Sequence, residues 1–155
     1  MIAPSRISLQ LVFPPDIAHR IVQASQTLAT IIASTFTLGT DAPPHITLFS
    51  YIGVTTEIAE RQTTVVFTDL LKLGDTDGRI WAGLGIAKTP IIVALREELI
   101  ATCGHPSLLR DEFHPHVTLG NIGVDEWEKS LPAIRHMLTG MTEAQCFTRV
   151  FSVPA

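Results

Sequence analysis

Two short segments of the chain combine a histidine and a threonine at a spacing that could support chemistry. The sequence reads PHITL around His45 and PHVTLG around His116, so the pattern H-x-T-L occurs twice. Residues i and i+2 of a strand point to the same side, and the pattern therefore places His45 with Thr47 and His116 with Thr118. Near neutral pH one imidazole can accept a proton while the other donates one. The hydroxyls can donate hydrogen bonds to phosphate oxygens, so the pattern favours phosphoryl chemistry without a metal or other cofactor.

The two motifs end two similar units, at approximately residues 5–53 and 78–123. Each unit reads as a strand with period-two hydrophobicity, a helix that begins at proline, and the strand that carries the motif. Such an internal repeat predicts a duplication with pseudo-twofold symmetry. We therefore expect a single domain over 1–155 of the α+β class, with two pseudo-twofold-related antiparallel sheets around a central cleft and helices outside.

Segments outside the two units carry further structural signals. The sequence predicts a short capped helix at 56–60, a strand at 64–73 and a turn at 75–78. It also predicts a helix from Asp125 with a break or kink at Pro132, followed by a final strand at 146–153.

The paired motifs resemble those of the 2H phosphoesterase superfamily, which includes 2′-5′ RNA ligase-like proteins and cyclic nucleotide phosphodiesterases. The resemblance covers nearly the whole chain and implies a bilobal fold with a central cleft. It also implies metal-independent opening of 2′,3′-cyclic phosphates, or reversible formation of 2′-5′ phosphodiester links. On this resemblance His45 and His116 match the catalytic histidines, and Thr47 and Thr118 match the phosphate-binding hydroxyls.

Five other side chains are candidates for substrate contact. Phe49 and Tyr51 continue the face of His45 if that strand is regular, and Trp81 lies on the polar side of its own strand. Aromatic rings in such positions could stack on a base, although core packing is the commoner role. Gln10 lies on the non-core face of the first strand, and His114 shares the face of His116.

Composition narrows the class of protein and of partner. The chain has 155 residues, 46% hydrophobic and 17% charged, with a formal net charge of −4. These values argue against disorder and against a protein that binds a long nucleic acid mainly by electrostatic attraction. No apolar run is long enough for a membrane span, no signal peptide is evident, and Cys103 and Cys146 read as small buried apolar groups, so we expect a cytoplasmic protein.

The motif surroundings favour a small substrate. Gly120 and Asn121 follow the second motif where many nucleic-acid-acting relatives have a basic residue, and no Lys and Arg cluster adjoins either motif in the sequence. Arg110 and Lys88 are the nearest candidate phosphate neighbours. A mononucleotide, an RNA end or another small cyclic phosphate is therefore the expected partner.

Other functions remain open at this point. The same cleft could bind a nucleotide or RNA end without turnover, or His114 and His116 could ligate a metal in a hydrolase. The sequence leaves open which histidine is the base, whether hydrolysis or ligation occurs, which product isomer forms, and the oligomeric state.

Overall fold

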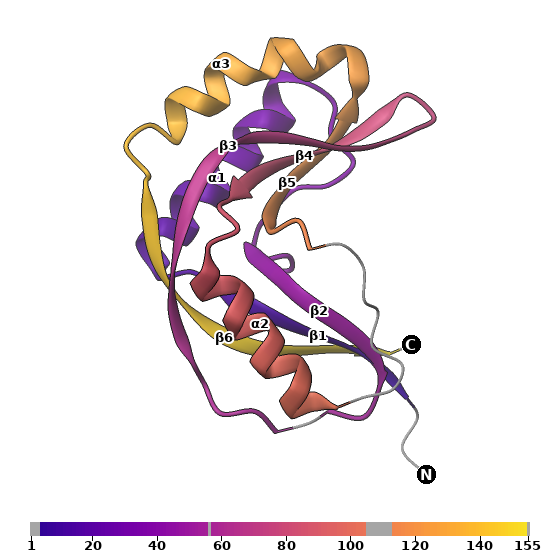
Figure 1. Cartoon of the computed structure of the whole chain (residues 1–155). Helices are drawn as coiled ribbons and strands as arrows, with labels where there is room; N and C mark the ends of the chain where they lie inside the picture. The colour runs from indigo at the N-terminus through magenta and orange to yellow at the C-terminus, as the bar shows by residue number, and fades with distance from the viewer. Residues whose placement is uncertain (1–3, 56, 105–112, 155) are drawn as a thin grey trace.

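Strands form the frame of the molecule, and helices pack against them (Figure 1). A computed structural model describes residues 4–55, 57–104 and 113–154. In chain order its elements are β1 (Ser5–Val12), α1 (Pro15–Ile31), β2 (His45–Gly53), β3 (Gln62–Thr76), β4 (Arg79–Ile86), α2 (Pro90–Cys103), β5 (His116–Gly123), a 3₁₀ turn (Val124–Glu126), α3 (Trp127–Met137) and β6 (Glu143–Pro154). The α+β class is confirmed.

The strands form one antiparallel series in the order β2-β1-β6-β3-β4-β5. The long strand β3 joins two groups, because residues 62–66 pair with β6 and the later part pairs with β4. The order is unchanged when β1, β2 and β3 exchange places with β4, β5 and β6. The two expected strand groups are thus continuous rather than separate sheets, and their origin by duplication stays a prediction.

The helices pack across the two halves of the chain. Helix α1, from the first half, contacts β5 and α3, whereas α2, from the second half, contacts β2 and β3. In Figure 1, α2 lies in front of the β2-β1-β6 group. The edge strands β2 and β5 also contact each other, so the two ends of the strand series meet.

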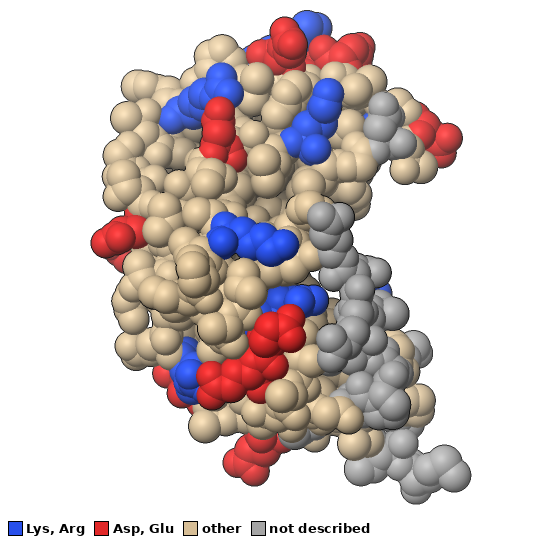
Figure 2. Space-filling view, viewed as in Figure 1, with Lys and Arg blue, Asp and Glu red and all other residues tan. Residues whose placement is uncertain are grey.

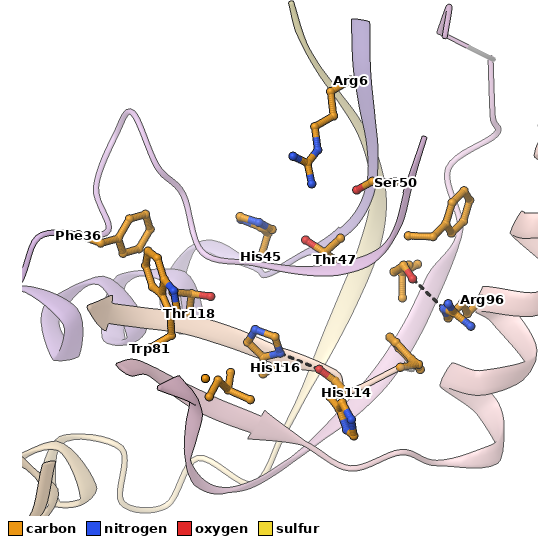
Figure 3. Close-up of a pocket in the computed structure, with 15 residues that line it drawn as sticks. Arg6, Phe36, His45, Thr47, Ser50, Trp81, Arg96, His114, His116 and Thr118 are labelled. Carbon is orange, nitrogen blue, oxygen red and sulfur yellow. Dashed lines mark hydrogen bonds between the residues drawn. The ribbon is translucent and has the colours of Figure 1, made fainter. Parts of the chain in front are cut away.

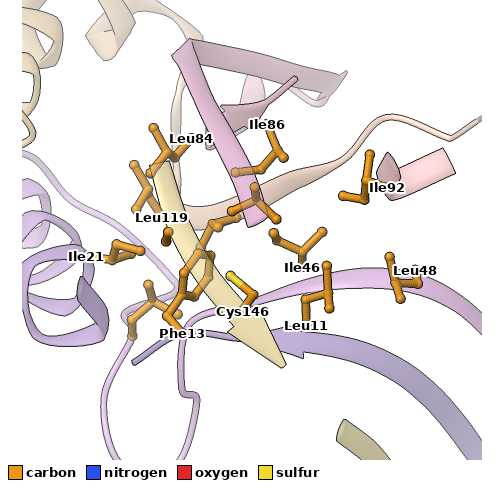
Figure 4. Close-up of a cluster of buried hydrophobic side chains, with 14 of the residues drawn as sticks. Leu11, Phe13, Ile21, Ile46, Leu48, Leu84, Ile86, Ile92, Leu119 and Cys146 are labelled. Atoms are coloured by element: carbon orange, nitrogen blue, oxygen red, sulfur yellow. The ribbon is translucent and has the colours of Figure 1, made fainter. Parts of the chain in front are cut away.

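A continuous apolar core lies between these layers (Figure 4). Leu9 and Leu11 of β1, Ile46 of β2 and Leu119 of β5 are all buried in it. Cys146 is completely buried in the same core, and burial raises the pKa of its thiol to about 12. Cys103 is half-buried rather than buried, which corrects the expectation for that residue.

Local sequence signals explain where the main elements begin and end. Helix α1 has Pro15 in its first turn, and the Thr89 hydroxyl accepts a hydrogen bond from the Ile92 amide at the start of α2. Asp77 and Gly78 both have positive φ angles and form a tight turn between β3 and β4. The predicted turn at 75–78 is therefore shorter, and β3 extends to Thr76.

The predicted short helix at 56–60 is wrong. Residues 57–60 form no helix, and Thr56 lies outside the described residues. Three of these four residues are exposed, so too little apolar surface is buried to stabilise so short a helix. The sequence predicts a break or kink at Pro132, and helix α3 continues through that residue, so the break is absent. Pro132 has no amide proton to donate to the Glu128 carbonyl. Both residues are exposed, so water can satisfy that carbonyl.

In the described part of the chain no helix is long and apolar enough to cross a membrane.

The β3–β4 contact predicts a steric constraint at Gly85. A Cβ there would lie 2.8 Å from the Asp69 carbonyl oxygen and would also meet the Thr68 hydroxyl. We expect Gly85→Ala to lower the free energy of unfolding by about 1–3 kcal/mol in urea denaturation. Gly39→Ala is the matched control, because nothing lies within 4 Å of a Cβ at Gly39. Equal stability of the two variants would contradict this packing.

Candidate active site

The four motif side chains lie around one cleft of about 670 Å³ (Figure 3). His45 and Thr47 come from β2, and His116 and Thr118 come from β5. The cleft therefore forms where the two ends of the strand series approach each other. All four side chains are at least partly accessible, as groups that contact a ligand must be.

Both histidines have the same hydrogen-bond arrangement. His45 Nδ1 lies 3.0 Å from the carbonyl oxygen of Pro43, and His116 Nδ1 lies 2.6 Å from that of His114. A carbonyl only accepts, so Nδ1 must carry the proton in each contact. The neutral ring then has its lone pair on Nε2, and the charged ring has a transferable proton there. Each imidazole is thus oriented so that Nε2 is the atom available for proton transfer.

A β-bulge follows each H-x-T motif. Leu48 has no partner in β1, because Leu9 pairs with Phe49 and Gln10 pairs with Thr47. Leu119 of β5 likewise has no partner in β4. Both leucines are buried, and the bulge lets each strand keep apolar side chains in the core after the motif has faced the cleft.

The bulge makes β2 irregular, so two aromatic residues do not continue the face of His45 as they would in a regular strand. Phe49 and Tyr51 are turned to the core side, 4% and 1% exposed, and the Tyr51 hydroxyl donates to the carbonyl oxygen of Val54. Phe49 still borders the cleft, whereas Tyr51 does not. Ser50 takes the cleft-facing position in their place, as Figure 3 shows. A bulge shifts the period-two alternation by one residue, and simple alternation cannot anticipate it.

The carbonyl of each bulge leucine is held by a helix from the other half of the chain. Ser25 Oγ of α1 donates to the Leu119 oxygen at 2.6 Å, and Arg96 Nε of α2 donates to the Leu48 oxygen at 2.8 Å. Ser25 is completely buried and also accepts from the Leu38 amide at 2.9 Å. These two contacts fix both motif strands relative to the helices behind them.

An aromatic pair borders the cleft beside the second motif. Trp81 is 43% exposed and meets Phe36 edge-to-face, with ring centroids 5.8 Å apart. Trp81 lines the cleft, and Phe36 joins it from the segment after α1. That segment is tied to β5, because the Thr35 amide donates to the carbonyl oxygen of Asn121 and the Thr35 hydroxyl donates to Asn121 Oδ1.

Two arginines line the cleft that the linear sequence did not bring together with the motifs. Arg6 is exposed, and Figure 3 shows its guanidinium directed toward the side of His45 and Thr47. Arg96 is only 12% exposed and lies over the ring of Phe113, which is itself buried. Period two places Arg6 on the face of Ser8 and Gln10, so strand alternation could have identified it. Arg96 depends on tertiary packing and had no such signal.

The remaining candidate residues have mixed positions. His114 is exposed and lies at the edge of the cleft, where its carbonyl holds His116. Gln10 is buried, hydrogen-bonds to the Ser8 hydroxyl and does not line the cleft. Lys88 is outside the cleft, and Arg110 lies outside the described residues. Within the described ranges, no three His, Cys, Asp or Glu side chains are grouped so that they could hold a metal ion.

The site therefore combines two oriented imidazoles, two hydroxyls and two arginine side chains at one cleft. This set can move protons to and from an oxygen atom and can hold an anionic group between the two motif strands. On the face seen in Figure 2, by contrast, Lys and Arg are interspersed with Asp and Glu.

Comparison with known proteins gives fold-level similarity only. No protein-family model matches the chain, and no curated protein matches it. Similar solved structures include Kluyveromyces marxianus Usb1, with 11% identity and a TM-score of 0.48, covering 97% of this chain and 98% of that one. Another is Kluyveromyces marxianus Usb1 with uridine monophosphate, with 9% identity, a TM-score of 0.47 and the same coverage.

The buried contact of Ser25 can be tested by removing its hydroxyl. Ser25→Ala leaves the buried Leu119 oxygen and Leu38 amide without this partner, and we expect a loss of about 1–3 kcal/mol in the free energy of unfolding. Thr30→Ala in the same helix is the control, since its exposed hydroxyl bonds only to the nearby Thr27 carbonyl. A Ser25→Ala protein as stable as Thr30→Ala would contradict the structural role of this hydroxyl.

Proposed function

We propose that the protein is a metal-independent phosphoesterase of the 2H type that opens a 2′,3′-cyclic phosphate of a nucleotide or RNA end. The observation that carries this proposal is the matched orientation of the two motif imidazoles, each with Nδ1 on a backbone carbonyl and Nε2 available. A hydroxyl two residues along the same strand accompanies each imidazole in the cleft. A cleft for mere binding would not require two groups prepared for proton transfer.

The reaction uses one histidine as base and the other as acid. The Nε2 lone pair of one imidazole removes a proton from water as the water oxygen forms a bond to phosphorus. The bond from phosphorus to O2′ or O3′ breaks, and the protonated Nε2 of the other imidazole supplies the proton that this oxygen needs. The products are a phosphomonoester and a free ribose hydroxyl. Because the two halves are alike here, either histidine can be assigned the first role.

The hydroxyls of Thr47 and Thr118 hold the non-bridging phosphate oxygens in this scheme. Donors directed at oxygens that gain charge stabilise the transition state more than the ground state. The Trp81 and Phe36 rings would contact the base of a nucleotide whose phosphate lies between the motifs. Base–aromatic stacking of this kind contributes roughly 1–3 kcal/mol per base.

The proposal predicts that both histidines are required for turnover in the presence of a chelator. We expect the wild type to open uridine 2′,3′-cyclic monophosphate in EDTA, and His45→Ala and His116→Ala each to lose about 10²–10⁴-fold in kcat. His19→Ala is the matched control, because His19 is exposed on α1 and does not line the cleft. Loss of wild-type activity in EDTA with recovery on added zinc would contradict the metal-independent mechanism.

The threonine hydroxyls are tested by substitutions that keep the shape of the side chain. Thr47→Val and Thr118→Val remove the donor, and we expect each to lower kcat about 10²–10³-fold. Thr47→Ser and Thr118→Ser keep a hydroxyl and should retain most of the activity. If valine and serine variants turn over the substrate equally well, the hydroxyls do not hold the phosphate.

A further inference from the structure

One face of the β2-β1-β6 group continues from the cleft and carries several exposed side chains. Side chains directly opposite each other in an antiparallel pair point to the same side. Four rows of residues therefore share the face of Thr47; we call this the open sheet face. Its rows are His45, Val12 and Phe147; Thr47, Gln10 and Arg149; Ser50, Ser8 and Phe151; and Ile52, Arg6 and Val153.

The open sheet face combines positive charge with exposed apolar groups. Arg6 and Arg149 are both exposed, and Arg149 lies 5.6 Å from the ring centroid of Phe151. Phe151 and Val153 are each 37% exposed, and Ile52 is 45% exposed. None of the residues in the four rows is acidic. The sequence alone does not predict this positive surface, because Arg6 and Arg149 come from opposite ends of the chain.

Comparison of the two halves shows that Arg6 is available for an external anion. Arg6 pairs with Ile52, seven residues after His45, and Arg79 pairs with Gly123, seven residues after His116. Arg79 is engaged, since its Nε donates to Asn121 Oδ1 at 2.7 Å and its Nη2 to the Asn121 carbonyl at 2.6 Å. Ser50 occupies the position that corresponds to Asn121, and its side chain is too short to play the same role.

Within the described residues the side chain of Arg6 makes no hydrogen bond or ion pair, although its backbone pairs with β2 and β6. It lines the cleft together with Thr47 and Ser50, so its guanidinium connects the phosphoryl site to the open sheet face. Arginines with an exposed aromatic ring on an open sheet are the groups that track the phosphates and bases of a single strand.

We propose that the open sheet face binds the single-stranded RNA that adjoins the processed end, so that the preferred substrate is an oligonucleotide and not a mononucleotide. Arg6 holds the first phosphate outside the phosphoryl site, Phe151 stacks on a base, and Arg149 holds a further phosphate. This inference rests on the proposed function for the reaction at the end of the strand. The negative net charge of the chain is compatible with it, because only a short strand is held and by local donors.

The test compares a tetrauridylate that ends in a 2′,3′-cyclic phosphate with uridine 2′,3′-cyclic monophosphate, both in EDTA. We expect the wild-type kcat/KM to be about tenfold or more higher for the tetranucleotide, and Arg6→Gln/Arg149→Gln to remove most of that preference. The double variant should also lower the salt dependence of oligonucleotide binding by about 1.4 in log–log slope, for two lost phosphate contacts. Phe151→Ala should reduce the preference about fivefold.

Lys88→Gln/Lys129→Gln is the charge-matched control. Both lysines are exposed, and neither lines the cleft nor belongs to the open sheet face. An equal kcat/KM for the two substrates in the wild type would overturn the proposal. The proposal would also be overturned if the arginine double variant and the lysine control preferred the tetranucleotide to the same degree.

A direct binding measurement separates this proposal from the proposed function. A fluorescein-labelled hexauridylate with a 3′-phosphate has no cyclic phosphate to open. If the wild type turns over neither cyclic phosphate but binds this probe, and the arginine double variant alone loses binding, the proposed function fails and the open sheet face is supported. If the probe binds neither the wild type nor the lysine control, or binds all variants equally, the open sheet face is overturned.

Discussion

The candidate site depends on how the backbone is held immediately after each H-x-T motif. Leu48 and Leu119 are the unpaired residues of two β-bulges, and their carbonyl oxygens accept hydrogen bonds from Arg96 and Ser25. Each bond joins a motif strand of one half to a helix of the other half. At each bulge the side chains change from facing the cleft to packing in the core. The two hydrogen bonds hold the backbone at that point. The separation of the two imidazoles is therefore set by contacts between the halves.

The two halves have similar backbones but different side chains, so the two sides of the cleft differ chemically. Beside the second motif, Arg79 is bound by Asn121 and the neighbouring surface is aromatic, with Trp81 and Phe36. Beside the first motif, Arg6 pairs with Ile52, Ser50 lies diagonally across from it, and the Arg6 guanidinium remains available. Under the proposed function, the features that the two halves share would perform the proton transfers, and the features that differ would determine how a substrate lies across the site.

Much of the frame follows from local patterns in the sequence. The strand at β1, the Thr89 cap of α2 and the two motif strands are recoverable because hydrophobic period, proline placement and capping residues are local properties. The burial of Tyr51 was not recoverable, because a bulge reverses the alternation without changing the residue types. Arg96 and Phe36 reach the cleft through packing between distant segments, which no single-strand pattern encodes. The roles of His45 and His116 in catalysis remain predictions.

The proposed reaction requires two imidazoles that transfer protons through Nε2, one as base toward water and one as acid toward the leaving oxygen. The most direct test is the pH dependence of kcat/KM for uridine 2′,3′-cyclic monophosphate in EDTA, measured for the wild type and for His45→Ala and His116→Ala. We expect a bell-shaped profile for the wild type and the loss of a different limb in each variant, because each histidine contributes one protonation requirement. A wild-type profile with a single limb, or variants that keep both limbs, would contradict it.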